Sequence, residues 1–203
     1  MIVIIDTGVA NRYSIHNAFS YIGCDVIVSS KPKDIEQADK LVFPGVGAFA
    51  LGMQSLKDRN LIPVLNEQVL VHHKPILGIC LGFQMMAEAS QEDGPCAGLG
   101  WVPGEVQGLS PEDPKLKVPH VGFNTVRPRG QSVLLGKTQT ETDFYFVHSY
   151  HLVTDPDIVA GTASYGNEMV AIIEHENIYG VQFHPEKSQS SGLDLLRRFS
   201  EVS

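Results

Sequence analysis

Residues 76–84 read Ile-Leu-Gly-Ile-Cys-Leu-Gly-Phe-Gln, a continuous apolar strand that runs into Gly-x-Cys-x-Gly and then into a helical pattern. The glycines at 78 and 82 permit a tight turn from strand to helix and close packing of the two elements. This pattern is typical of a nucleophile elbow, in which a reactive side chain projects from a strained turn. Because a helix N-terminus favours a negative charge, we expect Cys80 to act as a thiolate nucleophile.

Outward from this elbow, short apolar runs alternate with helical stretches, and Gly, Pro or Asp stands at the joins. This alternation predicts an α/β fold with an open, mostly parallel sheet and helices on both faces. Strands are expected at 2–5, 25–29, 40–43, 75–79, 144–147, 169–174 and 178–183. Helices are expected at 12–22, 53–59, 63–72, 81–89 and 193–202, with a short piece at 34–38. Residues 94–128 are rich in Gly and Pro and predict an added antiparallel β-ribbon with loops.

Composition limits the class of protein. The 203 residues suit one domain, 1–203, and are 43% hydrophobic. The net charge of −8 leaves no broad cationic surface, so a dedicated nucleic-acid binder is not expected. The longest apolar runs fall short of the roughly 20 residues of a membrane-spanning helix. The start, MIVIID, lacks the cationic flank of a secretory signal, and we expect a cytoplasmic protein with no membrane partner.

Three cysteines, Cys24, Cys80 and Cys96, are widely spaced and form no Cys-x-x-Cys pair. A disulfide framework or a structural zinc site is therefore disfavoured. His148 and His151 would lie on opposite faces of an extended segment, so we assign no metal. The sequence contains no glycine-rich phosphate-binding motif, so it offers no nucleotide cradle of its own.

A base for the thiol is offered by residues 180–186, which read Gly-Val-Gln-Phe-His-Pro-Glu. In an extended segment His184 and Glu186 share one face, because side chains alternate with period two. A carboxylate beside an imidazole fixes its tautomer and stabilises its charged form, which is the orienting role in a catalytic triad. His-x-Glu is a weak signal alone, and it becomes strong in combination with the elbow.

The loop Pro44-Gly45-Val46-Gly47 follows a buried strand. Its backbone is little hindered by side chains, so its N–H groups can face a developing oxyanion. An ordinary turn between a strand and a helix would be the better interpretation if the elbow were absent.

Taken together, these motifs resemble those of class I glutamine amidotransferases, and within that family those of the glutaminase subunits of imidazole glycerol phosphate synthases. The resemblance runs from about residue 2 to 199. It rests on the elbow, on the loop at 44–47 and on three further stretches. These are Pro119-His120-Val121-Gly122, Phe144-Tyr145-Phe146-Val147-His148-Ser149-Tyr150 and Val181-Gln182-Phe183-His184-Pro185-Glu186-Lys187-Ser188.

The resemblance implies roles for individual residues. Cys80 would attack the side-chain amide of glutamine, His184 would serve as base and acid, and Glu186 would orient His184. The backbone N–H of Leu81 and one from Gly45, Val46 or Gly47 would form the oxyanion hole. Glutamine would be held by Gln84 and by the backbone of His148, Ser149 and Tyr150. The partner interface would include Asn11, Phe123, Tyr145 and Lys187. No cofactor is implied.

The resemblance also implies a partner. This is a (β/α)8-barrel cyclase that receives ammonia through a tunnel and makes imidazole glycerol phosphate and an aminoimidazole carboxamide ribotide in histidine biosynthesis. Two alternatives remain open at this point: an amidotransferase subunit of another synthase, and a catalytically silent scaffold that only binds a partner. Ala10, Arg12 and Phe123 depart from the usual family pattern, and they bear on the subunit contact rather than on the triad.

Overall fold

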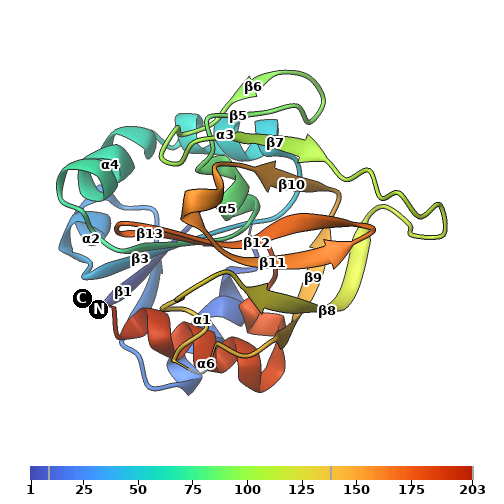
Figure 1. The fold of residues 1–203 in the computed structure, drawn as a ribbon. Coiled ribbons are helices and arrows are strands. Elements are labelled where there is room, and N and C mark those ends of the chain that lie inside the picture. The colour runs from blue at the N-terminus through green and yellow to red at the C-terminus, as the bar shows by residue number, and fades with distance from the viewer. Residues whose placement is uncertain (9, 138, 203) are drawn as a thin grey trace.

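The computed structural model describes residues 1–8, 10–137 and 139–202, and Figure 1 shows a twisted central sheet with helices on both faces. The strands of the main sheet are β1 Ile2–Ile5, β2 Val26–Ser29, β3 Lys40–Gly45, β4 Ile76–Cys80, β8 His120–Pro128, β9 Thr142–His148, β11 Val159–Tyr165, β12 Asn167–His175 and β13 Ile178–Val181. A smaller sheet contains β5 Ala89–Ser90, β6 Cys96–Ala97, β7 Glu105–Gly108 and β10 Tyr150–Val153. The helices are α1 Arg12–Tyr21, α2 Pro32–Gln37, α3 Phe49–Asp58, α4 Ile62–Asn66, α5 Leu81–Met85 and α6 Gln189–Ser200.

The main sheet has the order β2-β1-β3-β4-β13-β12-β11-β8-β9. Its first five strands are parallel, and each later neighbour is antiparallel. The predicted α/β class is therefore confirmed. Part of the expected ribbon, β8, extends the main sheet through β11 and β9 instead of standing apart from it.

The two cores lie on opposite faces of the sheet, as period-two alternation requires. Ile2 and Ile4 of β1 pack with α1 and α6, whereas Val3 and Ile5 pack with residues of α2, α3, α4 and α5. Figure 1 shows the same division, with α1 and α6 below the sheet and α3, α4 and α5 above it. No helix within the described residues is long and apolar enough to cross a membrane.

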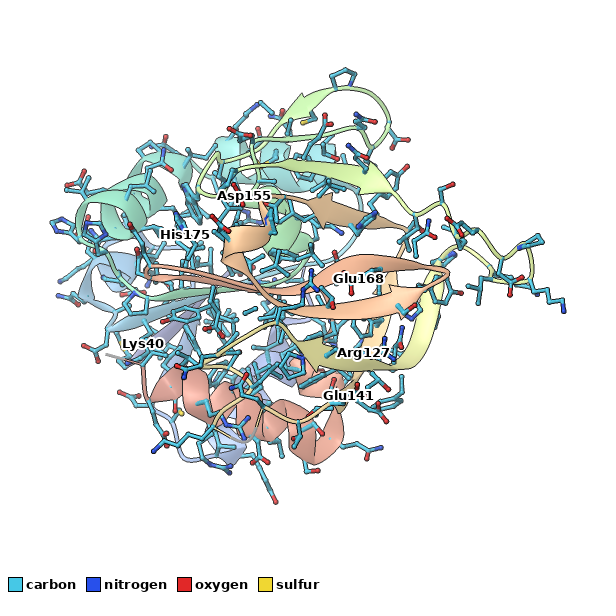
Figure 2. The ribbon with its side chains drawn as sticks, viewed as in Figure 1. Lys40, Arg127, Glu141, Asp155, Glu168 and His175 are labelled. Carbon is cyan, nitrogen blue, oxygen red and sulfur yellow. The ribbon has the colours of Figure 1, made fainter. Side chains whose placement is uncertain are left out.

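The antiparallel end of the sheet carries charged surface pairs. Arg127 on β8 bonds Glu141 at 3.2 Å, and Arg129 lies 3.6 Å from Glu168 on β12. Figure 2 shows Arg127, Glu141 and Glu168 together on this side of the molecule.

Several boundaries differ from the sequence prediction. The helix expected at 81–89 ends at Met85, because the carbonyl of Met86 accepts instead from the N–H groups of Trp101 and Val102, at 2.8 and 3.1 Å. Strand β11 was not expected, since Val-Ala-Gly-Thr-Ala-Ser-Tyr shows no clear strand pattern. Helix α3 begins at Phe49, four residues earlier than predicted.

The elbow itself depends on close contact between backbones. Cys80 has φ 54°, an unusual value for a residue with a side chain. At Gly82 a Cβ atom would overlap the carbonyl oxygen of Phe43 on β3, and at Gly180 it would overlap the ring of Phe83. Glycine at these positions lets α5 sit directly on β3, β4 and β13.

The first prediction concerns Gly82→Ala. Alanine is the better helix former by about 1 kcal/mol, yet we expect the substitution to destabilise the protein by about 1–3 kcal/mol or more, because a methyl group has no space against Phe43. Equilibrium unfolding in urea measures the change. Gly108→Ala is the matched control, because its Cβ would lie at an ordinary 3.7 Å from the ring of Tyr150. If both variants were equally stable, the packing argument would be wrong.

Candidate active site

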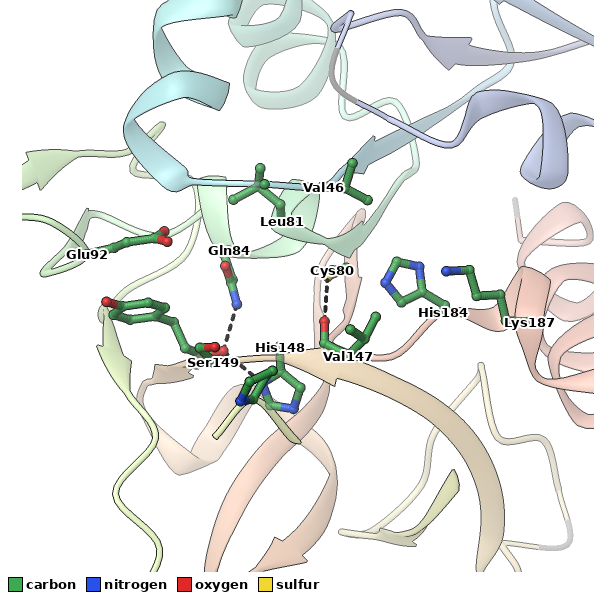
Figure 3. Close-up of a pocket in the computed structure, with 13 residues that line it drawn as sticks. Val46, Cys80, Leu81, Gln84, Glu92, Val147, His148, Ser149, His184 and Lys187 are labelled. Atoms are coloured by element: carbon green, nitrogen blue, oxygen red, sulfur yellow. Dashed lines mark hydrogen bonds between the residues drawn. The ribbon is translucent and has the colours of Figure 1, made fainter. Parts of the chain in front are cut away.

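The candidate nucleophile ends β4 and precedes the first turn of α5. Cys80 is 7% exposed, and its Sγ lies 3.9 Å from the carbonyl oxygen of Val147 on β9. It faces a cavity of about 420 Å3, which Figure 3 shows in close-up. The lining residues are Val46, Gly47, Cys80, Leu81, Gln84, Glu92, Pro119, Val147, His148, Ser149, Tyr150, His184 and Lys187. The structure therefore brings the elbow to an open space that a small molecule can enter.

The imidazole of His184 and the carboxylate of Glu186 form a buried pair. Nδ1 of His184 lies 2.9 Å from Oε1 of Glu186, and the side chains are only 3% and 1% exposed. The two residues flank Pro185 at the start of a 3₁₀ turn, Pro185–Lys187, which follows β13. Because Nδ1 is held by the carboxylate, Nε2 is free to act on the side of Cys80, where Figure 3 shows the ring.

A hydroxyl that the sequence analysis did not single out fixes this turn. Oγ of Ser188 donates to the carbonyl of His184 at 2.6 Å and accepts from the N–H of Tyr145 at 2.9 Å. Ser188 is 1% exposed. The segment that carries the imidazole is thus tied to β9, the strand that also provides part of the cavity wall.

The surroundings of His184 favour its charged form. Burial alone would lower the pKa, but the nearby sulfur of Cys80 and the bonded carboxylate of Glu186 outweigh it and raise the pKa of His184 to about 9. A cation between a sulfur and a carboxylate is the arrangement that a thiolate-imidazolium pair needs. Nε2 of His184 and Oε2 of Glu186 are buried and have no hydrogen-bond partner among the described residues, and of the two residues only His184 lines the cavity.

Three of the predicted oxyanion residues, Val46, Gly47 and Leu81, line the cavity. Gly45 does not line it; it ends β3 and is the register partner of Cys80 on β4. Gly47 has φ 98° and would meet nothing within 4 Å if it carried a Cβ, so the loop beyond Gly45 is loosely surrounded. The loop and the elbow therefore meet at the same edge of the parallel sheet.

All four predicted glutamine contacts line the cavity, and the structure refines the role of Gln84. Its Nε2 donates to the carbonyl of Tyr150 at 2.8 Å and to Oε1 of Gln182 at 3.0 Å. Both amide hydrogens are then used within the protein, so only Oε1, an acceptor, is left for a ligand. Gln182 is fully buried, and its Nε2 lies 4.0 Å from Sγ of Cys80.

Glu92 is a lining residue that the sequence analysis missed. It lies in the loop after β5, and its Oε2 accepts from the N–H of Phe49 at 2.7 Å. No local motif marks it, because its place in the cavity depends on the long-range contact with the start of α3. Among the described lining residues it provides the carboxylate at the end of the cavity away from His184 (Figure 3).

The predicted interface residues fall into two groups. Nζ of Lys187 lies 5.7 Å from the ring centroid of Tyr145, and that ring meets Phe123 edge-on at 5.6 Å. These three side chains form a strip from the cavity to the surface, where Phe123 is 51% exposed. Asn11 does not belong to this strip; it precedes α1 and accepts from Oγ of Ser14 at 3.1 Å.

Within the described residues, no group of three or more His, Cys, Asp or Glu side chains is placed to hold a metal ion.

Residues 3–201 match the family model described as "Glutamine amidotransferase class-I". The chain therefore belongs to the class-I glutamine amidotransferase family, the class that its elbow, buried imidazole and sheet define.

Within this family, the chain is clearly similar to proteins named as subunits of imidazole glycerol phosphate synthase. The chain is 44% identical over 202 residues to a Campylobacter jejuni protein named imidazole glycerol phosphate synthase subunit HisH 1, with 100% of both chains covered. It is 43% identical over 203 residues to HisH 2 of Pseudomonas aeruginosa, again over 100% of both chains. It is 46% identical to HisH of Methanothermobacter thermautotrophicus, over 100% of this chain and 98% of that one. The resemblance found in the sequence is thereby confirmed.

Solved structures agree on the fold. One glutamine amidotransferase superimposes with a TM-score of 0.75 at 16% identity, covering 99% of this chain and 98% of the other. A glutamine amidotransferase from Thermotoga maritima gives a TM-score of 0.64 at 15% identity, covering 98% of this chain and 82% of the other. At such low identity these likenesses concern the fold alone.

The second prediction follows from the charge balance at His184. Its folded pKa, about 9, lies above the ordinary 6.5, so protonated His184 stabilises the fold below about pH 6.5, and this contribution is lost as the pH rises through 9. Cys80→Ala removes a sulfur that raises the pKa of His184, whereas the burial that lowers this pKa remains. The pKa of His184 should therefore fall in the variant. Titration of the imidazole by NMR in both proteins measures the shift. An unchanged midpoint in the variant would contradict the assigned pairing.

Proposed function

We propose that the chain is the glutaminase subunit of an imidazole glycerol phosphate synthase and that it hydrolyses glutamine to glutamate and ammonia. The observation that carries the proposal is the convergence of a thiol on a strained elbow with the buried His184–Glu186 pair at one cavity. The resemblance to HisH proteins over the full chain supports the same activity.

In the first step, Sγ of Cys80 attacks the side-chain amide carbon of glutamine, and a carbon-sulfur bond forms. Protonated His184 gives its proton to the amide nitrogen, the carbon-nitrogen bond breaks, and ammonia leaves a glutamyl thioester. Neutral His184 then takes a proton from water, which attacks the thioester and releases glutamate. The carbon-sulfur bond then breaks, and the departing thiolate and protonated His184 restore the ion pair that began the cycle.

The backbone near the elbow supplies the electrostatic part of the proposal. The amide oxygen gains negative charge as the thiolate adds. The N–H of Leu81 at the start of α5 and an N–H from the loop Gly45-Val46-Gly47 are the donors we assign to it. Glu186 keeps Nδ1 of His184 protonated, so that Nε2 faces the reacting atoms.

The two ends of glutamine suit opposite features of the cavity. Glu92 and Oε1 of Gln84 are acceptors, and we assign them to the α-ammonium group of glutamine. The backbone strip His148-Ser149-Tyr150 would hold the α-carboxylate, as the sequence resemblance implies. The carbonyls of Ser149 and Tyr150 are already engaged by the protein, so they do not oppose an anion there.

The proposed partner is a cyclase subunit with a (β/α)8-barrel fold. It would receive ammonia through an internal tunnel and make imidazole glycerol phosphate in histidine biosynthesis; the lyase step belongs to that partner. We assign the strip Phe123, Tyr145 and Lys187, together with Asn11, to the docking surface. No cofactor enters the proposed chemistry.

The alternatives from the sequence are less well supported. A silent scaffold would not need an imidazole whose pKa is raised to about 9 beside a buried cysteine. A subunit of another synthase would not be expected to match HisH proteins at 43–46% identity from end to end.

We further propose that residues 1–203 act as one amidotransferase domain. A cytoplasmic location remains a prediction.

The third prediction is that Cys80→Ala abolishes glutamine hydrolysis, because the thiolate is the proposed nucleophile. The complex should still make product from added ammonia, since the partner's chemistry does not use Cys80. Glutamate release and ammonia-dependent synthesis are measured side by side. The control is Cys96→Ala, a half-buried thiol outside the cavity, which should retain activity. Near wild-type glutamate release by Cys80→Ala would show that Cys80 is not the nucleophile.

The fourth prediction is that the free chain is a poor glutaminase and that partner docking activates it. The glycines beside Val46 let a peptide rotate at low steric cost, so an oxyanion donor can be absent at rest and present on demand. One such donor is worth about 10² to 10³ in rate, which sets the smallest activation we expect. Glutamate release is compared for the free chain, the complex, and the complex with nucleotide ligand. Equal rates in all three would refute the gating argument and leave the role of Cys80 intact.

A further inference from the structure

A chain of buried polar side chains, which we call the histidine relay, lies behind the cavity wall and is not explained by the triad. Nδ1 of His148 lies 2.8 Å from the carbonyl oxygen of Tyr150, and Nε2 of His148 lies 3.1 Å from Nδ1 of His120. On the far side, Nε2 of His120 lies 3.3 Å from Nδ2 of Asn124. His148 lines the cavity, whereas His120 does not appear among its described lining residues.

The direction of every bond in the relay is fixed by its ends. A carbonyl oxygen only accepts, so His148 must carry its proton on Nδ1 and use Nε2 as an acceptor. His120 must then donate from Nδ1, and its own Nε2 accepts from Asn124. The second amide hydrogen of Asn124 goes to the carbonyl of Ser164 at 2.9 Å, so no member is left unsatisfied.

The environment keeps both imidazole rings neutral and packs the ring of His120 between aromatic side chains. Burial is the main cause that lowers the pKa of His120 and of His148 to about 4. For His148, the hydrogen bond to the Tyr150 carbonyl raises the pKa, whereas the neighbouring His120, His151 and His184 lower it further. The ring of His120 is stacked between Phe146 and Tyr165, with centroids 4.9 and 4.0 Å away. A neutral ring with one donor and one acceptor, held in a stack, is suited to orient its neighbour rather than to exchange protons.

The end of the relay is the backbone strip that we assign to glutamine. The Tyr150 carbonyl accepts from His148 on one side and from Nε2 of Gln84 on the other. The Ser149 carbonyl accepts from the N–H of Leu109 at 2.8 Å. Both peptide planes of the strip are therefore held by partners on the protein side, and one of these partners depends on His120.

We propose that His120 is a positioning residue for glutamine: through His148 it fixes the Tyr150 carbonyl and thereby the strip 148–150 against which the substrate binds. The inference rests on the proposed glutaminase function. His120 acts in it without touching the substrate.

Two substitutions separate the hydrogen bond from the aromatic stack. His120→Phe keeps a ring between Phe146 and Tyr165 but removes the donor to His148, whereas His120→Asn keeps a donor at the δ position and removes the ring. In the complex with the partner, we expect His120→Phe to raise KM for glutamine about tenfold with kcat changed less than about twofold, the pattern of lost ground-state binding. His120→Asn should restore most of the loss in KM.

Thr125→Val is the matched control, because it removes the 2.7 Å bond from Thr125 to Asp143 between the same two strands, β8 and β9, outside the relay. Its KM should equal that of wild type. A wild-type KM in His120→Phe, or a KM for His120→Asn as high as that for His120→Phe, would overturn the proposal.

A spectroscopic test needs no turnover. In ¹⁵N-histidine-labelled Cys80→Ala protein, the proposal requires His120 and His148 both to be neutral Nδ1–H tautomers at neutral pH. An Nε2–H tautomer or a charged ring at His148 would overturn it, even if His120→Phe failed to fold. If wild-type complex released no glutamate, the proposed function would fail, while the tautomers would still report on the relay.

Discussion

The close contact between Gly82 and the carbonyl of Phe43 is the constraint on which the site depends. It allows α5 to begin directly on β3, so that Cys80 ends β4 with φ 54° and its side chain faces the cavity. The neighbours of β4 follow from this placement. Gly45 on β3 is the register partner of Cys80, and Val181 on β13 is that of Ile79. The oxyanion loop and the His184 segment therefore leave parallel strands on either side of the nucleophile, at the carboxyl edge where open α/β sheets bind ligands.

Charge balance explains why so polar a site can be buried. An isolated ion in the interior carries a large desolvation penalty, but His184 lies between a cysteine sulfur and a carboxylate. Its pKa of about 9 reflects hydrogen bonding and attraction that exceed the effect of burial. The Ser188 hydroxyl and the Phe144–Phe183 stack, at 4.0 Å between centroids, hold the segment against β9. The imidazole is thus oriented before any substrate arrives.

Local motifs predicted much of the site, and long-range pairing explains what they missed. The elbow, the His-x-Glu pair and the glycine loop are each contained within a few residues, so the sequence displays them directly. Glu92, Gln182 and His120 reach the site only through partners 28 to 102 positions away. The family stretches contain Gln182 and His120, but neighbouring residues do not reveal such long-range contacts. The same reason explains the early end of α5, where Trp101 competes for the carbonyl of Met86. Alternation and turn residues predicted the parallel strands well, and β11 was missed because its small residues give no periodic signal.

Strands β8 and β9 connect the outer surface to the substrate strip. Phe123 pairs with Tyr145 in their register, and His120 pairs with His148 three positions along. The first pair belongs to the exposed strip that we assign to the partner, and the second to the relay behind the cavity. The sheet ends at β9, and the outer side of β9 is held by the 184–188 segment through the bonds of Tyr145 with His184 and Ser188. The proposed docking surface and the proposed substrate strip therefore share the paired strands β8 and β9.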